Sequence, residues 1–161
     1  MKSVMLDTSF CIRLTNQDDP LNINAVDYLE YFLENKFIIF VSTIVIAEYA
    51  VKEDPSNLPL ETMRIAPFDF DDAKKAGEFF NILYSEPIDK TDTNRTAIKD
   101  DCKIISQIAN RNITHYITND RKSFRKLIQP IIQAGLLNVE FIDLSIPLTD
   151  FKSELPFPSE N

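Results

Sequence analysis

Residues 2–9 of the chain read Lys2-Ser3-Val4-Met5-Leu6-Asp7-Thr8-Ser9, an apolar run that ends in a carboxylate and two hydroxyl residues. The apolar part predicts a buried strand over residues 2–6, and Thr8 or Ser9 is of a type that caps a helix beginning around Phe10. An ionised side chain directly after a buried strand is costly unless it has a partner. Asp7 is therefore a candidate functional residue, with a plain helix-capping role as the alternative.

Strand and helix patterns alternate along the rest of the chain. Strands are expected at residues 37–41, 63–68, 115–118 and 139–144, and helices at residues 22–35, 44–52, 71–84, 96–111 and 121–132, the last broken near Pro130. We expect residues 85–95 to form a loop. One domain should span residues 1–145, followed by an irregular tail over residues 146–161. The alternation predicts an α/β fold, a three-layer α/β/α sandwich with a central, mostly parallel sheet and function at the carboxyl ends of its strands.

Composition removes several function classes. The chain has two glycines and one histidine, which excludes glycine-rich phosphate loops, HExxH zinc sites and most histidine-dependent triads. A net charge of −8 argues against a simple basic coat for nucleic acid, without excluding an enzyme that acts on it. Neither a secretion signal nor an apolar run approaching the roughly 20 residues of a membrane span is present, so we expect a cytoplasmic protein. Cys11 and Cys102 lack metal-binding spacing and are expected to be packed, reduced thiols.

Two further carboxylates lie in apolar helix segments. Glu48 is part of the mostly apolar stretch 44–51, where a carboxylate is expensive to bury without a cation, and an exposed helix charge is the alternative. At 100° per residue, Asp101 falls at the centre of the apolar face of helix 96–111, whereas Asp100 falls on its flank. We therefore take Asp101 as a ligand and Asp100 as an auxiliary residue.

A fourth carboxylate, Asp120, follows the apolar strand segment that ends in Asn119. A turn or cap role would explain Asp120 if it stood alone. Four carboxylates at strand ends or on inward helix faces instead favour one repelling cluster that a hard cation such as Mg²⁺ or Mn²⁺ would hold together.

The segments that carry these acids resemble the four signature segments of PIN domains, in order and spacing, over roughly residues 2–144. They are Met5-Leu6-Asp7-Thr8-Ser9, Ile46-Ala47-Glu48, Asp101-Cys102-Lys103-Ile104-Ile105 and Ile117-Thr118-Asn119-Asp120. The resemblance implies a PIN-like fold whose acids bind one or two divalent metals. It also implies endoribonuclease activity, often as the toxin of a toxin–antitoxin pair in the VapC-like branch. Asp7, Glu48, Asp101 and Asp120 are then the catalytic, metal-binding residues, with the choice between Asp100 and Asp101 still open.

Residues beside the acids complete the expected site. Thr8, Ser9, Thr118 and Asn119 are candidates for hydrogen bonds to metal ligands or substrate. Lys99, Lys103, Arg121, Lys122 and Arg125 form a local basic rim for the phosphate backbone of an RNA substrate, and a solvated helix surface explains them equally well. The toxin role would imply an antitoxin that blocks the acidic cleft and a homodimer.

Two other functions compete with the ribonuclease. The first is a catalytically inactive PIN-like module that binds RNA or protein. The second is a magnesium-binding, receiver-type signalling domain, which would need several acids near the first strand. The chain offers Asp18 and Asp19 only in a predicted loop.

Overall fold

The computed structural model, which describes residues 1–85, 92–123 and 128–154, is built around one sheet in the order β3-β2-β1-β4-β5. The strands are β1 (Ser3–Leu6), β2 (Ile38–Ser42), β3 (Arg64–Ala66), β4 (His115–Thr118) and β5 (Glu140–Asp143). All four pairings are parallel, as the alternation of strands and helices predicts. The direction of the strand order reverses between β1 and β4, which makes this position the switch point of the sheet. In open α/β sheets, ligands bind at the carboxyl ends of the strands at the switch point.

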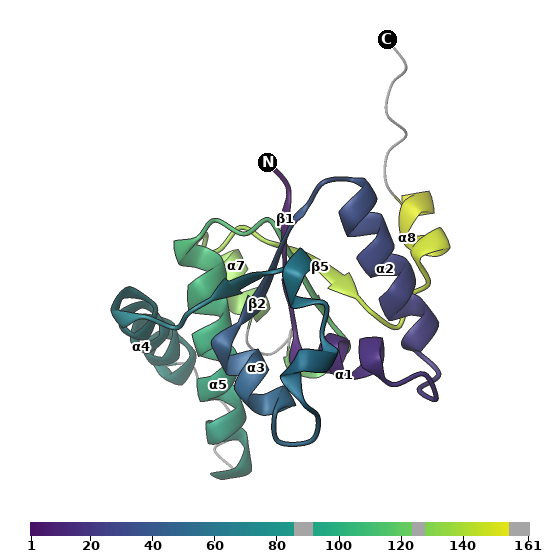
Figure 1. Ribbon diagram of the computed structural model, residues 1–161. Helices are drawn as coiled ribbons and strands as arrows, with labels where there is room; N and C mark the ends of the chain where they lie inside the picture. Colours follow the sequence, from purple (N-terminus) through teal and green to yellow (C-terminus); the bar gives the residue numbers. More distant parts are fainter. Residues whose placement is uncertain (86–91, 124–127, 155–161) are drawn as a thin grey trace.

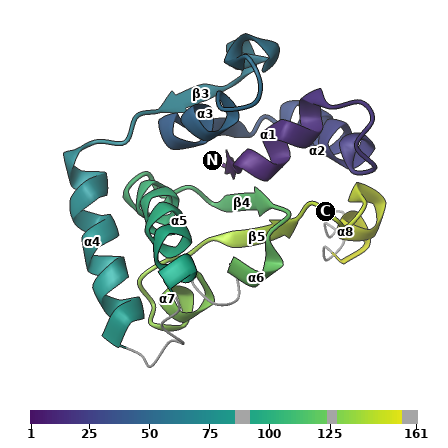
Figure 2. The same cartoon turned by 90° about the horizontal axis from the view of Figure 1, so that it is seen from below.

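Helices cover both faces of the sheet. They are α1 (Thr8–Thr15), α2 (Asn22–Glu34), α3 (Thr43–Tyr49), α4 (Phe70–Ser85), α5 (Asp92–Asn110), α6 (Arg121–Ser123), α7 (Gln129–Gln133) and α8 (Leu148–Glu154), with 3-10 turns at Pro55–Asn57 and Leu60–Thr62. Helices α4, α5 and α7 lie on one side of the sheet, and α2 and α8 lie on the other (Figure 1). The second view shows the same layers with β1 nearly end-on (Figure 2). The predicted three-layer α/β/α sandwich is confirmed.

The strand order also bears on the signalling alternative. Flavodoxin-like and receiver-type domains have the order 2-1-3-4-5, whereas this sheet has the order 3-2-1-4-5. The two orders place different strands beside the switch point. The fold therefore does not support a receiver-type domain.

Three local expectations are wrong. Asp7 caps α1, because its carboxylate, and not a hydroxyl of Thr8 or Ser9, accepts the backbone N–H of Ser9. Residues 92–95 belong to α5 and not to a loop; their polar sequence hides the helix, although an acidic first residue suits a helix start. The expected interruption near Pro130 agrees with the structure, because α7 begins at Gln129 and Pro130 lies in its first turn, where proline is tolerated.

The third wrong expectation is the irregular tail. Residues 148–154 form α8, and proline is compatible with a helix start, so Pro147 precedes the helix without preventing it. The ring of Phe151 packs against Tyr28 of α2, with centroids 5.9 Å apart. Residues 86–91, 124–127 and 155–161 lie outside the described part of the chain, so the remaining expectations for them stay predictions.

The core fills the space between the sheet and its helices. All four residues of β1 and of β4 are buried. Phe32 and Phe37 pack with ring centroids 5.1 Å apart, and Asn24 donates a hydrogen bond to the Leu144 carbonyl oxygen, which ties α2 to the end of the sheet. The two cysteines are free and buried, as expected. In the part of the chain that the structure describes, no helix has the length and apolarity needed to cross a membrane.

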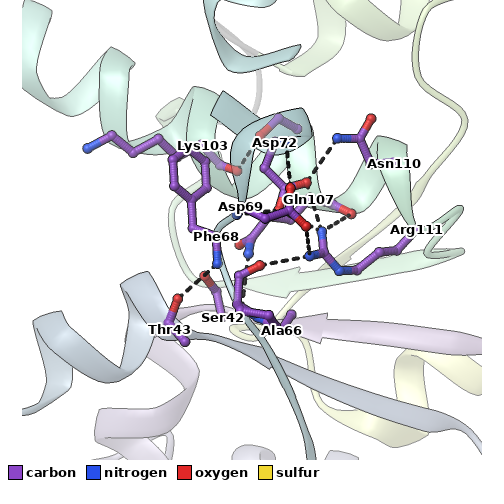
Figure 3. A network of polar contacts seen from close by, with 12 residues as sticks. Ser42, Thr43, Ala66, Phe68, Asp69, Asp72, Lys103, Gln107, Asn110 and Arg111 are labelled. Carbon is purple, nitrogen blue, oxygen red and sulfur yellow. Dashed lines mark hydrogen bonds and ion pairs between the residues drawn. The ribbon is translucent and has the colours of Figure 1, made fainter. Parts of the chain in front are cut away.

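A polar network fixes the end of α5 against the start of α4 (Figure 3). Asp72, 1% exposed, accepts hydrogen bonds on both carboxylate oxygens from Arg111 Nη1, at 2.8 and 2.9 Å, and one from Asn110. Burial works to raise the pKa of Asp72, but these bonds outweigh it and the pKa lies below its ordinary value. Arg111 Nη2 also donates to the Pro67 carbonyl oxygen at 2.7 Å. The network holds α5, which carries Asp101, in place.

Candidate active site

A pocket of about 310 Å³ lies at the carboxyl ends of β1 and β4. Its lining includes all four acids singled out from the sequence, which are Asp7, Glu48, Asp101 and Asp120. The other lining residues are Thr8, Ser9, Ile12, Arg13, Tyr116, Thr118 and Ile128. Segments far apart in the chain therefore meet at the switch point of the sheet.

The parallel topology explains how the acids meet. Asp7 directly follows β1, and its backbone N–H donates to the Ile117 carbonyl oxygen of β4 at 3.2 Å. Asp120 lies two residues beyond β4, and Glu48 lies near the end of α3, which directly follows β2. Asp101 comes from α5, on the inward side of the helix, and is partly buried. Each acid reaches the pocket because an element brings it to the same edge of the sheet.

The carboxylate of Asp7 is oriented by a chain of hydrogen bonds. Ser9 Oγ and Thr118 Oγ1 each lie 2.7 Å from Asp7 Oδ2. The backbone N–H of Asn119 donates to Ser9 Oγ, and that of Asp120 donates to Thr118 Oγ1, both at 3.0 Å. Because an N–H can only donate, both hydroxyls accept there and direct their own protons to Asp7. The two hydroxyl groups therefore fix one oxygen of this carboxylate.

Glu48 and Asp120 are also held by neighbours. The Thr8 hydroxyl donates a hydrogen bond to Glu48 Oε2, which joins α1 to α3. Asp120 Oδ1 accepts the backbone N–H of Lys122 at 3.0 Å and so caps the short helix α6. Both carboxylates are exposed at the pocket, in contrast to the partly buried Asp7 and Asp101.

The two adjacent acids of α5 have different surroundings. Asp101 lines the pocket. Asp100 instead pairs with Lys103 Nζ at 2.7 Å, and both of these side chains are about 40% exposed, at 39% and 40%. Of the two, Asp101 is therefore the residue positioned to act in the pocket, and its role as a ligand stays a prediction.

Three residues of the predicted basic rim have side chains that the structure describes, and two of these, Lys103 and Arg121, are paired with acids. Arg121 Nε pairs with Asp143, a buried residue at the end of β5. Lys122 is exposed. The side chain of Lys99 and residue Arg125 lie outside what the structure describes. None of the described members of the predicted rim lines the pocket.

The carboxylates impose a negative potential on their surroundings. Burial, with Asp7 and then Asp101 adding to it, raises the pKa of Tyr116 well above its ordinary value. Burial raises the pKa of Cys11 to about 12, with Asp7 adding to the effect. The pKa of Cys102 also rises to about 12, through burial and then Asp101. A pocket with this potential attracts cations.

The donor set fits a hard divalent cation by its chemistry. The pocket offers four carboxylates and the hydroxyls of Thr8, Ser9 and Thr118, all of them oxygen donors of the kind Mg²⁺ and Mn²⁺ prefer. In the described residues, no group of three or more His, Cys, Asp or Glu side chains is already arranged to hold a metal ion. The four acids share the pocket, and their role as metal ligands stays a prediction.

The sequence did not indicate three groups of residues at the pocket or beside it. Arg13 and Ile12 line the pocket, and their spacing from Ser9 on one helix face was a usable signal. Tyr116 and Ile128 also line it, but their apolar surroundings in the sequence indicate only a core position. The pairing of Arg121 with Asp143 depends on the contact between β4 and β5, which no local pattern predicts. Asn119, which was a candidate from the sequence, contributes to the site through its backbone N–H, which donates a hydrogen bond to Ser9 Oγ.

The strand order, the three layers and the position of the pocket define a PIN-like α/β/α domain. One similar solved structure is VapBC2 from Rickettsia felis, bound to a DNA fragment from the VapBC2 promoter. The two chains are 23% identical over 87% of this chain and 98% of that one, with a TM-score of 0.61. FitAcB from Neisseria gonorrhoeae is 18% identical over 85% and 96% of the two chains, with a TM-score of 0.59.

A third similar structure is VapC20 from Mycobacterium tuberculosis, described as a sarcin-ricin loop cleaving toxin. It is 17% identical over 74% of this chain and 92% of that one, with a TM-score of 0.53. The sequence itself matches no protein-family model and no curated protein. At these identities the likeness establishes the fold, and the predicted PIN-like fold is confirmed.

Proposed function

We propose that this protein is a divalent-metal-dependent endoribonuclease whose active site is the acidic pocket. The observation that carries the proposal is that four acids, from four separate segments, line one pocket at the switch point of the sheet. VapC20, which shares the fold, is described as a toxin that cleaves the sarcin-ricin loop. That description supports a nuclease without fixing the RNA that this chain cuts.

The proposed reaction is hydrolysis of an RNA phosphodiester. The oxygen of a water molecule bonds to phosphorus, the ester bond to the leaving oxygen breaks, and that oxygen takes up a proton. Asp7, Glu48 and Asp101 would hold the principal metal ion, and Asp120 would complete the site or orient the water. A bound Mg²⁺ or Mn²⁺ would supply the positive charge that activates water and stabilises the leaving oxygen.

The residues around the acids would position them. Ser9 and Thr118 hold Oδ2 of Asp7, so that this carboxylate keeps one orientation. Thr8 restrains Glu48 in the same way from the start of α1. Restraints of this kind tune metal ligands, and their loss typically costs about 10- to 100-fold in affinity or activity.

A role as a toxin is a further part of the proposal. A toxin that cleaves cellular RNA needs an inhibitor, and an antitoxin protein that covers the acidic pocket would serve. We also propose a homodimer and a cytoplasmic location. Sedimentation velocity of the purified protein tests the dimer, and a single monomeric species at high concentration would contradict it.

The nuclease proposal is tested by RNA cleavage. Purified protein is incubated with mixed structured and single-stranded RNAs in Mn²⁺, in Mg²⁺ and in EDTA, beside Asp7→Asn. Asp27→Asn, an exposed residue in the middle of α2, is the matched control. We expect cleavage that needs metal and Asp7 but not Asp27. Metal binding without cleavage of any RNA would favour the inactive, RNA- or protein-binding module.

A further inference from the structure

The acidic pocket contains one basic residue among its described lining residues, Arg13 of α1. Its side chain is 23% exposed, and Nη1 donates to the Ser9 carbonyl oxygen at 2.9 Å. The main chain of Arg13 is also fixed, because Asn22 Nδ2 donates a hydrogen bond to the Arg13 carbonyl oxygen at 2.7 Å. The guanidinium is therefore anchored on the same helix turn as the Ser9 that orients Asp7.

The guanidinium keeps donors available for a ligand. Its ion-pair partner Asp19 is 3.7 Å from Nε, beyond hydrogen-bond distance. The same oxygen of Asp19 accepts the Leu21 N–H at 2.8 Å. Nε of Arg13 is buried and is therefore not open to a ligand, so the remaining donors are on the two terminal nitrogens, of which Nη1 uses one N–H on the Ser9 carbonyl oxygen. A guanidinium has five N–H donors, so this group is held in place but only partly used.

Other basic residues near the site differ in this respect. Lys103 is paired with Asp100 at 2.7 Å, and Arg121 is paired with the buried Asp143. An ion that is already neutralised at close range has less to offer a phosphate than one whose partner lies farther away. Arg13 both lines the pocket and has the longer ion pair.

An RNA strand brings negative charge to a pocket that already holds four carboxylates. Like charges repel, and cations bound by the acids would offset only part of that repulsion. Arginine matches phosphate geometry with paired N–H donors. We propose that Arg13 binds a phosphate oxygen of the RNA substrate at the pocket and thereby sets the affinity of the enzyme for its substrate. This inference rests on the proposed ribonuclease function.

The test uses a single-stranded RNA that the wild-type protein cleaves, with KM and kcat measured over a range of salt concentrations. Arg13→Gln should raise KM on the order of 10-fold with little change in kcat, because it removes a charged hydrogen bond made to the substrate. The slope of log(kcat/KM) against log salt should fall by about 0.7, the value for one phosphate contact on a single strand. Arg13→Lys should keep most of that slope.

Arg64→Gln is the matched control, because Arg64 is an exposed arginine on the edge strand β3. It should leave KM and the salt slope unchanged. If Arg13→Gln equals this control while the wild type cleaves RNA, the inference fails and the proposed function stands. If the wild type cleaves no RNA, the proposed function fails first.

Two further outcomes separate phosphate binding from other roles. A lower requirement for Mn²⁺ in Arg13→Gln, with an unchanged salt slope, would assign Arg13 to balancing the acids and overturn the inference. Should Arg13→Gln unfold, Asp19→Asn tests the same idea with Arg13 intact. Removing the competing anion should lower KM at low salt, and an unchanged or higher KM would count against the proposal.

Discussion

Replacing Thr118 with valine removes one hydroxyl group from the centre of the site without changing the size of the side chain. Thr118 is 2% exposed, and its hydroxyl donates to the Asp7 carboxylate at 2.7 Å. A hydrogen bond to a charged group contributes about 1.5–3 kcal/mol. The backbone N–H of Asp120 also loses its acceptor, in a bond that is partly buried. We expect Thr118→Val to lower the free energy of unfolding by about 2 kcal/mol.

The assay is urea unfolding followed by circular dichroism, with Mn²⁺ affinity measured by calorimetry on the same samples. A loss of this size corresponds to about 4–8 °C in Tm for a chain of this length, and metal affinity should fall about 10- to 100-fold. Thr118→Ser keeps the hydroxyl and should retain most of both. Thr62→Val is the control, because the Thr62 hydroxyl bonds the Pro59 carbonyl oxygen on the surface.

Two results would show that the Thr118 hydroxyl does not have this role. The first is a Thr118→Val protein as stable as Thr62→Val, which would mean that the bond to Asp7 contributes nothing. The second is a Thr118→Ser protein as damaged as Thr118→Val, which would make the methyl group, and not the hydroxyl, the important feature.

Three further predictions concern the helix network and the thiols. Arg111→Ala should lower the free energy of unfolding, measured by urea titration, by about 3 kcal/mol, because the buried Asp72 loses its main partner. The control Lys75→Ala breaks a surface ion pair and should change the free energy of unfolding by less than about 0.5 kcal/mol. Equal losses in the two variants would contradict this prediction. In the folded protein the pKa of Asp72 lies below its ordinary value of 3.8. The ionised Asp72 therefore stabilises the fold fully above pH 3.8, and this stabilisation is lost as the pH falls through the folded-state pKa. Acid should therefore destabilise the wild type more than Asp72→Asn, and parallel pH curves would rule this out. With pKa values of about 12, Cys11 and Cys102 should resist iodoacetamide near neutral pH until the protein unfolds, and rapid labelling of the native protein would disprove it.

The central strands and the acids could be predicted because their signals are local. The run Val4-Met5-Leu6 has no polar interruption, and a buried strand is the direct consequence. Asp101 lies at the centre of an apolar helix face, so helical periodicity alone separates it from Asp100. Alternation of strands and helices then brings the strand ends to one edge, where Asp7 and Asp120 meet.

The features that were not predicted depend on side-chain choice or on long-range contacts. For Asp7, helix capping and a role in the pocket were stated as alternatives, and only the structure shows that this residue both caps α1 and lines the pocket. Arg121 resembles a free phosphate binder in the sequence, but β5 brings Asp143 to it. Arg13 was not singled out, because only the structure shows which side of α1 faces the pocket.

In the proposed function, the pocket acids act together, through a divalent cation, to cleave RNA. This function is tested most directly by the cleavage rate measured against Mn²⁺ concentration for the wild type, Asp101→Asn and the surface control Asp27→Asn. We expect Asp27→Asn to follow the wild-type curve and Asp101→Asn to show little cleavage at any Mn²⁺ concentration. Cleavage by Asp101→Asn at the wild-type rate, or wild-type cleavage that persists in EDTA, would contradict it.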